Sequence, residues 1–175
     1  RETFIADKGN LLLSADYSQV ELRILAHLSK DEVLVDAFSK GIDVHAKTAS
    51  EIFGVTVDKV TDEMRRTAKT VNFGVIYGMS PFGLSAALSI PHEEAKKYIE
   101  KYFERHLGVR EYIDVALIEA KKKGYTMTLA GRRRPIPEIR SQNSNARAQA
   151  ERLAVNSPIQ GSAADIIKIA MINIR

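Results

Sequence analysis

RRTAKTVNFGVIYG, residues 65–78, carries two basic and then two aromatic residues at intervals of four: Arg65, Lys69, Phe73 and Tyr77. In a helix with 3.6 residues per turn, these four side chains follow one strip. The opposite stripe is apolar and consists of Met64, Ala68, Val71 and Val75. The segment therefore predicts a helix that packs on a core with one side and presents the strip on the other.

Two interpretations of this strip stay open. Phe73 and Tyr77 can pack beneath a neighbouring lobe while Arg65 and Lys69 are solvated, which is the commoner situation for an isolated helix. Alternatively, cations near the start of the helix bind a polyanion, and an aromatic ring two turns later stacks on a base. Phosphates at one end and a base at the other describe a nucleoside triphosphate.

The composition favours an ordinary globular chain. Its 175 residues are 27% charged and 45% hydrophobic, which suits one domain or two small lobes. No run of about 18 apolar residues exists for a membrane span, and the first residues do not resemble a signal peptide, so we expect an intracellular protein without a membrane partner. The absence of cysteine excludes disulfides and thiolate metal sites, and oxygen ligands favour a hard ion such as magnesium.

Positive charge is concentrated in residues 121–140. This segment carries a formal charge of +6, whereas the rest of the chain carries −2. Such a stripe attracts a phosphate backbone, but a solvated run of charge is about as common, so the charge alone does not decide for nucleic acid.

The hydrophobic pattern predicts mostly helices. We expect a buried strand over 10–17, followed by helices over 18–29, 31–40, 43–53 and 61–77 and a short helix after Pro81. A helical pair follows over 91–106 and 109–124, interrupted at Leu107 and Gly108, and a β-hairpin is expected from 125–131 and 132–139. The chain ends with helices over 143–156 and from Pro158 onward. The last helix reaches Arg175 without a capping signal, which suggests that the chain has been cut there.

Two carboxylates near the first helix have both structural and functional interpretations. Asp16 follows the predicted strand, where a carboxylate can project into a cleft and hold a divalent ion, or can simply make a hydrogen bond at the helix entry. Ser18 and Glu21 fit the S-x-x-E capping box, in which Ser18 caps the helix and Glu21 bonds back to it.

The longest motifs resemble those of a known family. DYSQVELRILAHLS (16–29) resembles motif A, and RRTAKTVNFGVIYG resembles motif B, of the family A DNA polymerases of the bacterial DNA polymerase I type. Three further segments are similar to the same family: DVHAKTASEIF (43–53), TLAGRRRPIPEI (128–139) and ERLAVNSPIQGSAADIIKIAM (151–171). The resemblance therefore covers nearly the whole chain.

The resemblance implies a helix-rich α/β fold, with a polymerase palm built on a small antiparallel sheet and a helical fingers subdomain. Residues 1–30 would be a palm segment with motif A, and residues 31–124 the fingers with motif B. Residues 125–175 would return to the palm with the hairpin and the DNA-tracking helices.

The resemblance also implies roles at the nucleotide. Asp16 would be one of two aspartates that hold two Mg²⁺ ions, with the Tyr17 carbonyl as a further ligand. Arg65 and Lys69 would bind the triphosphate, and Lys69 would protonate the departing pyrophosphate. The other implied nucleotide contacts are Ser18, Gln19, Glu21, His45, Phe73 and Tyr77.

These contacts have different implied functions. His45 would touch the β-phosphate, and Phe73 would stack on the incoming nucleotide and disfavour dideoxynucleotides. Tyr77 would guard the templating pocket. Glu21 would exclude a ribose 2′-hydroxyl, which favours deoxynucleotides over the ribonucleotides of the single-subunit RNA polymerases that share the architecture.

The implied DNA contacts lie near the end of the chain. Arg152, Asn156 and Gln160 recur at intervals of four and would follow the minor groove of the primer–template without sequence preference. Arg132, in the hairpin, would hold backbone phosphates. Each of these residues can instead be an ordinary solvent-facing side chain. The remaining histidines, His27, His92 and His106, are interpreted as ordinary helix residues.

The second catalytic aspartate of the family belongs to a His-Asp motif expected just beyond Arg175, and the thumb, the first part of the palm and any proofreading domain are expected before Arg1. We therefore expect the chain alone to be inactive and its parent to be a DNA polymerase. The partners would be primer–template DNA and deoxynucleoside triphosphates, for a monomer in the cytoplasm of a bacterial or phage-infected cell. A non-catalytic nucleic-acid-binding module and a helical scaffold with a solubilising hairpin remain alternatives.

Overall fold

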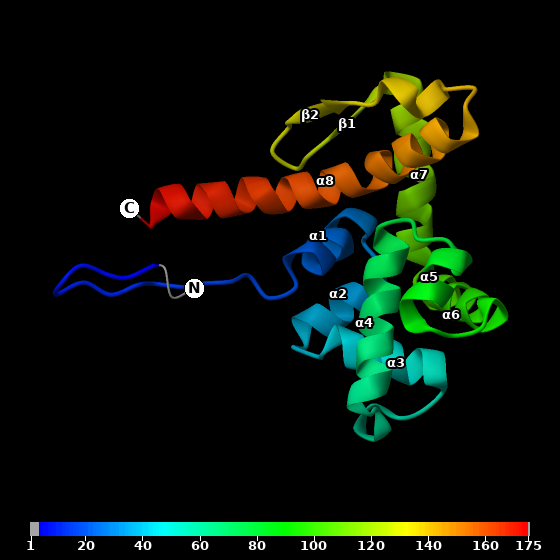
Figure 1. The fold of residues 1–175 in the computed structure, drawn as a ribbon, viewed down its shortest axis with the longest axis horizontal. Coiled ribbons are helices and arrows are strands. Elements are labelled where there is room, and N and C mark those ends of the chain that lie inside the picture. The colour runs from blue at the N-terminus through cyan, green and yellow to red at the C-terminus, as the bar shows by residue number, and fades with distance from the viewer. Residues whose placement is uncertain (1–3, 175) are drawn as a thin grey trace.

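The computed structural model of the chain describes residues 4–174 (Figure 1). Its helices are α1 (Val20–Ser29), α2 (Glu32–Ser39), α3 (Val44–Phe53), α4 (Asp62–Ile76), α5 (Pro81–Leu88), α6 (His92–Arg105), α7 (Leu107–Lys123) and α8 (Ser144–Asn173). Two short 3₁₀ helices, η1 (Val57–Lys59) and η2 (Pro137–Arg140), and the strands β1 (Tyr125–Met127) and β2 (Arg133–Pro135) complete the order. Helices α2 to α6 form one lobe, and α7 connects it to the hairpin and the long helix α8 (Figure 1).

The main core surrounds α4. Ala68, Val71 and Val75 are buried there, which confirms the predicted apolar stripe, and Met64 at its start is half-buried. Buried residues of α1, α2, α3 and α6 pack into the same cluster. The strip at 65–77 therefore lies on a helix that is fixed by its other face.

Polar side chains start most of these helices. The side chains of Asp31, Asp43, Thr61, Ser80 and Asn143 accept hydrogen bonds from backbone N–H groups in the first turns of α2, α3, α4, α5 and α8, respectively. Each such cap satisfies donors that a helix leaves free at its start.

The capping box predicted at Ser18 is not formed. Gln19 precedes α1 with left-handed backbone angles, φ 54° and ψ 36°, and makes no side-chain cap. The Ser18 carbonyl instead accepts a hydrogen bond from Arg23 Nε at 3.0 Å. Glu21 is consequently free to bond elsewhere.

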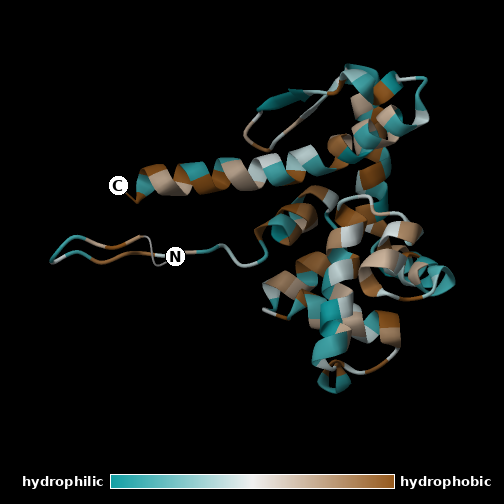
Figure 2. Cartoon of the chain, in the orientation of Figure 1, coloured by the Kyte–Doolittle hydropathy of each residue, from teal (hydrophilic) through white to brown (hydrophobic). Residues whose placement is uncertain are grey.

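The strand predicted over 10–17 is also wrong. These residues form an extended segment that projects from α1 (Figure 1), and Leu11 is 95% exposed. A strand needs a neighbour for its backbone groups, and within residues 4–174 the sheet contains just β1 and β2. Figure 2 shows apolar residues along this segment and on the last turns of α8.

The hairpin is confirmed. β1 and β2 are antiparallel, with Tyr125 opposite Pro135, Thr126 opposite Arg134 and Met127 opposite Arg133. A second apolar cluster fixes its base to α7 and α8; its buried members are Ala120, Ile136, Ile139, Ala150 and Ala154. This packing fixes the position of the hairpin relative to α8.

The predicted pair of C-terminal helices is a single helix, because the tertiary contacts compensate for Pro158. Proline lacks the N–H that would bond the Ala154 carbonyl. The Thr126 hydroxyl of β1 donates to that carbonyl at 3.3 Å, and the Tyr112 hydroxyl of α7 donates to the Val155 carbonyl at 3.1 Å. The Ala154 carbonyl that proline frees is therefore satisfied by β1, and the adjacent Val155 carbonyl ties the same turn to α7.

The break between α6 and α7 falls at His106, one residue before the predicted position. His106 is 1% exposed, and its Nδ1 lies 3.0 Å from Asp31 Oδ1, so it is not an ordinary helix residue. Position 108 is occupied by glycine because the first turn of α7 lies directly against the linker before α2, which leaves no room for a side chain. A Cβ on Gly108 would come within 2.8 Å of Asp31 Cα.

Candidate functional site

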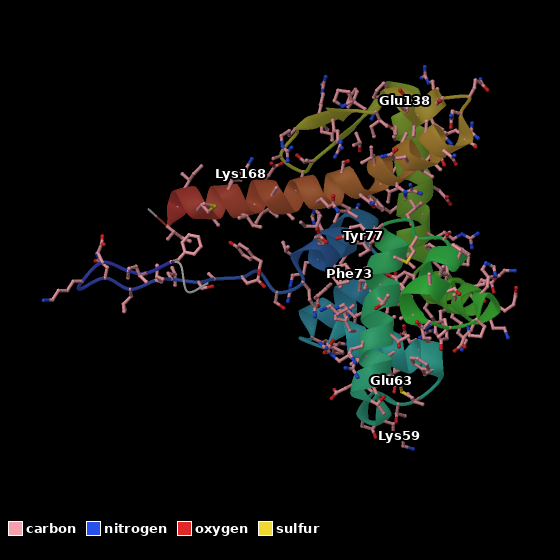
Figure 3. All side chains as sticks on the ribbon, in the orientation of Figure 1. Lys59, Glu63, Phe73, Tyr77, Glu138 and Lys168 are labelled. Carbon is pink, nitrogen blue, oxygen red and sulfur yellow. The ribbon has the colours of Figure 1, made fainter. Side chains whose placement is uncertain are left out.

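The strip on α4 forms a row of rings at one end of the helix. The ring centroids of Phe73 and Tyr77 lie 6.1 Å apart with an interplanar angle of 21°, and His45 of α3 lies 6.0 Å from Phe73. Phe73 and Tyr77 are half-buried, so each ring keeps an accessible part. Figure 3 shows both residues on the half of α4 that lies nearer to α8.

Tyr77 joins three segments that are distant in sequence. Its hydroxyl donates to Glu21 Oε2 of α1 at 2.5 Å, and Gln160 of α8 lies close enough to the same hydroxyl to affect its pKa. Burial and the Glu21 carboxylate raise the pKa of Tyr77, while Gln160 opposes the shift. Tyr77 is therefore protonated at neutral pH and holds the carboxylate, and three predicted site residues are brought together.

Arg65 is held by an acidic partner that sequence reasoning missed. Its Nε lies 2.7 Å from Asp43 Oδ2, while Asp43 Oδ1 accepts from the amides of His45 (2.9 Å) and Ala46 (3.2 Å). Burial raises the pKa of Asp43, but the Arg65 guanidinium and these amides outweigh it and lower the pKa overall. The signal for Asp43 was its position as the cap of α3. Lys69, one turn further along α4, is exposed.

His45 is 3% exposed and is held between α3 and α4. Its Nδ1 lies 3.0 Å from Asn72 Nδ2, and Asn72 Oδ1 accepts from the Thr48 hydroxyl at 3.2 Å. Burial lowers the pKa of His45, and the charges of Arg65 and Lys69 act in the same direction against Asp43. His45 is thus neutral at physiological pH. Asn72 was missed, although a polar residue in the core half of a helix signals a buried hydrogen-bond network.

Asp16 lies in the extended segment before α1 and is exposed, as are its neighbours Tyr17 and Ser18. Across residues 4–174, no three histidine or carboxylate side chains converge in a manner suited to a metal ion. Asp16 and the Tyr17 carbonyl supply two oxygens, whereas Mg²⁺ takes about six ligands. The described residues therefore do not fit a complete magnesium site.

The predicted DNA contacts follow one side of α8. Arg152 packs over the end of α4, where a Cβ on Gly78 would lie 3.0 Å from Arg152 Cγ. Asn156 is half-buried with its Oδ1 unbonded among the described residues, and Gln160 is exposed beside Tyr77. This side of α8 therefore lies next to the C-terminal end of α4, where the strip ends at Tyr77.

Arg132 differs from this group because its guanidinium is already engaged. Its Nη2 lies 2.9 Å from Asp165 Oδ1 and donates to the Gly161 carbonyl at 3.1 Å. Asp165 also accepts from the Thr128 hydroxyl at 2.7 Å, and Thr128 and Arg132 both lower its pKa. Sequence reasoning missed Asp165. Elsewhere in the hairpin, Arg133 lies 4.8 Å from the ring centroid of Tyr125.

No helix within the described part of the chain is both long and apolar enough to cross a membrane.

Comparisons with known proteins agree on one family. The family model for DNA polymerase family A matches residues 1–175. DNA polymerase I of Lactococcus lactis subsp. lactis (strain IL1403) is 55% identical over 175 residues, which are 99% of this chain and 20% of that protein. DNA polymerase I of Bacillus subtilis (strain 168) is 54% identical over 174 residues, with the same coverage.

Among solved structures, the POL domain of Pol1 from M. smegmatis in complex with DNA primer–template and dNTP is similar with a TM-score of 0.87 and 53% identity. The similarity covers 91% of this chain and 28% of that chain. The chain spans about a fifth of the length of the curated relatives it matches.

Proposed function

Since the chain belongs to DNA polymerase family A, we propose that the protein carrying it performs template-directed DNA synthesis. A deoxynucleotide is added to a primer 3′-hydroxyl by nucleotidyl transfer, and pyrophosphate leaves. The observation that carries this proposal is the α4 strip, on which two cations precede two accessible rings and Tyr77 links the strip to α1 and α8. Residues 1–30 and 125–175 would belong to the palm, and residues 31–124 to the fingers.

The strip binds the incoming nucleotide along its length. Arg65 and Lys69 contact the triphosphate, and Lys69 donates a proton to pyrophosphate as it leaves. His45, neutral and adjacent to Phe73, contacts the β-phosphate, and Phe73 stacks on the base. Exposure of Lys69 and the half-buried state of Phe73 support this order, because both groups remain reachable by a ligand.

Glu21 selects the sugar. The Tyr77 hydroxyl holds the Glu21 carboxylate in one position, so it can exclude a ribose 2′-hydroxyl while Ser18 and Gln19 border the nucleotide. Glu21→Ala in the whole protein is expected to admit ribonucleotides, measured as the ratio of kcat/KM for dCTP and CTP. An unchanged ratio would contradict this role.

Arg152, Asn156 and Gln160 follow the minor groove of the primer–template. Their common side of α8 supports this role, since hydrogen-bond donors there meet acceptors that all base pairs share. Arg132 contacts phosphate only if it exchanges its Asp165 partner for the backbone, so we propose a smaller contribution from it.

A divalent ion, Mg²⁺ in our proposal, would use Asp16 and the Tyr17 carbonyl among its ligands in the whole protein. When bound, such an ion stabilises negative charge on the transferring phosphate. Because the described residues do not complete its ligand set, we assign no step to it, and we expect residues 1–175 alone to extend primers poorly or not at all.

The proposal is tested by Lys69→Ala in the whole protein, with single-turnover extension of a primer–template. Loss of a charge that stabilises the transition state costs about 10²- to 10³-fold in rate. Lys59→Ala is the matched control, because Lys59 is also exposed but lies on η1, before the start of α4 (Figure 3). A Lys69→Ala rate within twofold of the control would contradict the assignment.

Asp16 is exposed and belongs to no group of three potential metal ligands among the described residues, which favours one alternative. A non-catalytic nucleic-acid-binding module would retain salt-dependent binding of primer–template but never extend it. Binding and extension measured on the same preparation of the whole protein distinguish the two functions.

A further inference from the structure

A buried polar cluster between α3 and α4 has no role in the function proposed above. It consists of Thr48 on α3 and Asn72 on α4, and Asn72 is 0% exposed. A buried side-chain amide costs free energy unless its hydrogen bonds are made, whereas an apolar residue at the same position would not. Asn72 makes them across the helix pair, one to Thr48 and one to His45.

The direction of these bonds determines where the histidine proton lies. The Thr48 hydroxyl donates to Asn72 Oδ1, so the amide presents its Nδ2 hydrogen to His45 Nδ1. A ring nitrogen that accepts a hydrogen bond carries no proton, and a neutral imidazole carries its single proton on the other nitrogen. His45 is therefore an Nε2–H donor, and Nε2 is the nitrogen that remains for a ligand.

The charges around His45 favour the neutral ring. Burial lowers its pKa first, and Arg65 and Lys69 of α4 lower it further, while Asp43 at the start of α3 opposes them. A neutral ring binds an anion only through an N–H group, because an unprotonated nitrogen would direct its lone pair at the phosphate oxygen. The tautomer of His45 therefore decides whether its Nε2 attracts or repels a phosphate oxygen.

We propose that Asn72 is a positioning residue, which fixes His45 as the Nε2–H tautomer and so makes the ring a hydrogen-bond donor to the triphosphate of the incoming nucleotide. The role of the triphosphate rests on the proposed function. The tautomer rests on the contacts among Thr48, Asn72 and His45 alone.

The tautomer is measured on the intact protein labelled with ¹⁵N-histidine, using long-range ¹⁵N–¹H spectra at pH 7.5 (about one unit above the ordinary histidine pKa). The signals of His45 are assigned by their loss in His45→Gln. We expect protonated Nε2 and unprotonated Nδ1, and a shift of the proton to Nδ1 in Asn72→Asp, whose carboxylate only accepts. Protonated Nδ1 in the parent protein would overturn the proposal.

A second measurement separates positioning from packing. Asn72→Asp is expected to raise KM for the nucleotide about tenfold at pH 8, with a smaller change in kcat, and the loss should shrink toward pH 6, where the ring beside a carboxylate becomes protonated at both nitrogens. Thr70→Val is the control, because the Thr70 hydroxyl bonds to the Arg66 carbonyl within α4. Equal, pH-independent losses of kcat and kcat/KM in Asn72→Asp would overturn the proposal.

The two proposals fail separately. A parent protein that binds no nucleotide refutes the proposed function, while the spectra still report the tautomer. A parent that extends primers but carries Nδ1–H refutes the role of Asn72 alone.

Discussion

His106→Ala should loosen the lobe of α2 to α6 at the point where three elements meet. Asp31 caps α2 by accepting from Leu34 N at 3.1 Å, and its second oxygen accepts from Gly108 N of α7 at 3.1 Å. His106 Nδ1 lies 3.0 Å from the same carboxylate, and both side chains are 2% exposed. The substitution leaves a buried carboxylate with two of its three partners.

The expected cost follows from these contacts. A hydrogen bond to a charged group contributes about 1.5–3 kcal/mol, and the loss of His106 leaves the buried carboxylate with one acceptor site unpaired. The lost contact between the rings of His106 and Tyr102, 4.3 Å apart, adds a small cavity term. We therefore expect about 3 kcal/mol, which corresponds to about a 150-fold change in a local opening constant.

Native-state hydrogen exchange of the intact protein measures this constant in peptides from α2 and from the start of α7. Asp36→Asn is the matched control, because it removes the exposed Asp36–Lys40 pair on the same helix, and such pairs contribute about 0–1 kcal/mol. If the amide hydrogens of α2 exchange no faster in His106→Ala than in Asp36→Asn, the reasoning is refuted.

The same pair predicts the direction of a pH effect. Burial raises the pKa of Asp31, but His106 and the backbone amides that bond the carboxylate outweigh it, so the pKa is lowered overall. Its stabilisation is therefore complete above the unfolded-state pKa of about 3.9 and is lost as the pH falls through the folded-state value. Asp31→Asn should flatten the acid limb of the α2 exchange profile, and an unchanged limb would contradict this.

Three further predictions concern other contacts. Gly108→Ala should destabilise the α6–α7 junction by about 2 kcal/mol or more, measured by hydrogen exchange, because the added Cβ meets backbone atoms that cannot rotate away; exchange equal to the parent would contradict it. Thr126→Val should cost about 1 kcal/mol by leaving the Ala154 carbonyl unpaired, and a neutral result by thermal unfolding would count against that bond. Asp43→Asn should retain the α3 cap but release Arg65, so KM for the nucleotide should become more salt-dependent, and an unaltered salt slope would show that the ion pair has no influence.

Local patterns were enough to predict most of the helices. The apolar stripe of α4, the hairpin and the positions of α2 and α3 follow from the spacing of apolar residues and of the turn residues between them. The errors have one common cause, since they concern segments whose structure depends on distant partners. Residues 10–17 read as a strand but have no neighbour in the described sheet. Pro158 reads as a break but lies within a helix, because Thr126 satisfies the freed Ala154 carbonyl and Tyr112 holds the same turn to α7.

The candidate site shows the same division. Motif spacing predicted the strip from Arg65 to Tyr77, and the structure adds the contact of Tyr77 with Glu21, 56 residues away. Asp43, Asn72 and Asp165 were missed because each acts by orienting a side chain that is distant in sequence; a local pattern marks Asp43 as a cap and Asn72 as a buried polar residue, but it does not name their partners. His106 was misinterpreted because its partner Asp31 is 75 residues away.

The most direct test of the account is a crystal structure of the intact protein with primer–template DNA, Mg²⁺ and an incoming deoxynucleotide. We expect the triphosphate within hydrogen-bond distance of Arg65 and Lys69, with the base against Phe73. A triphosphate bound away from α4, with these side chains in contact with solvent alone, would contradict the central claim.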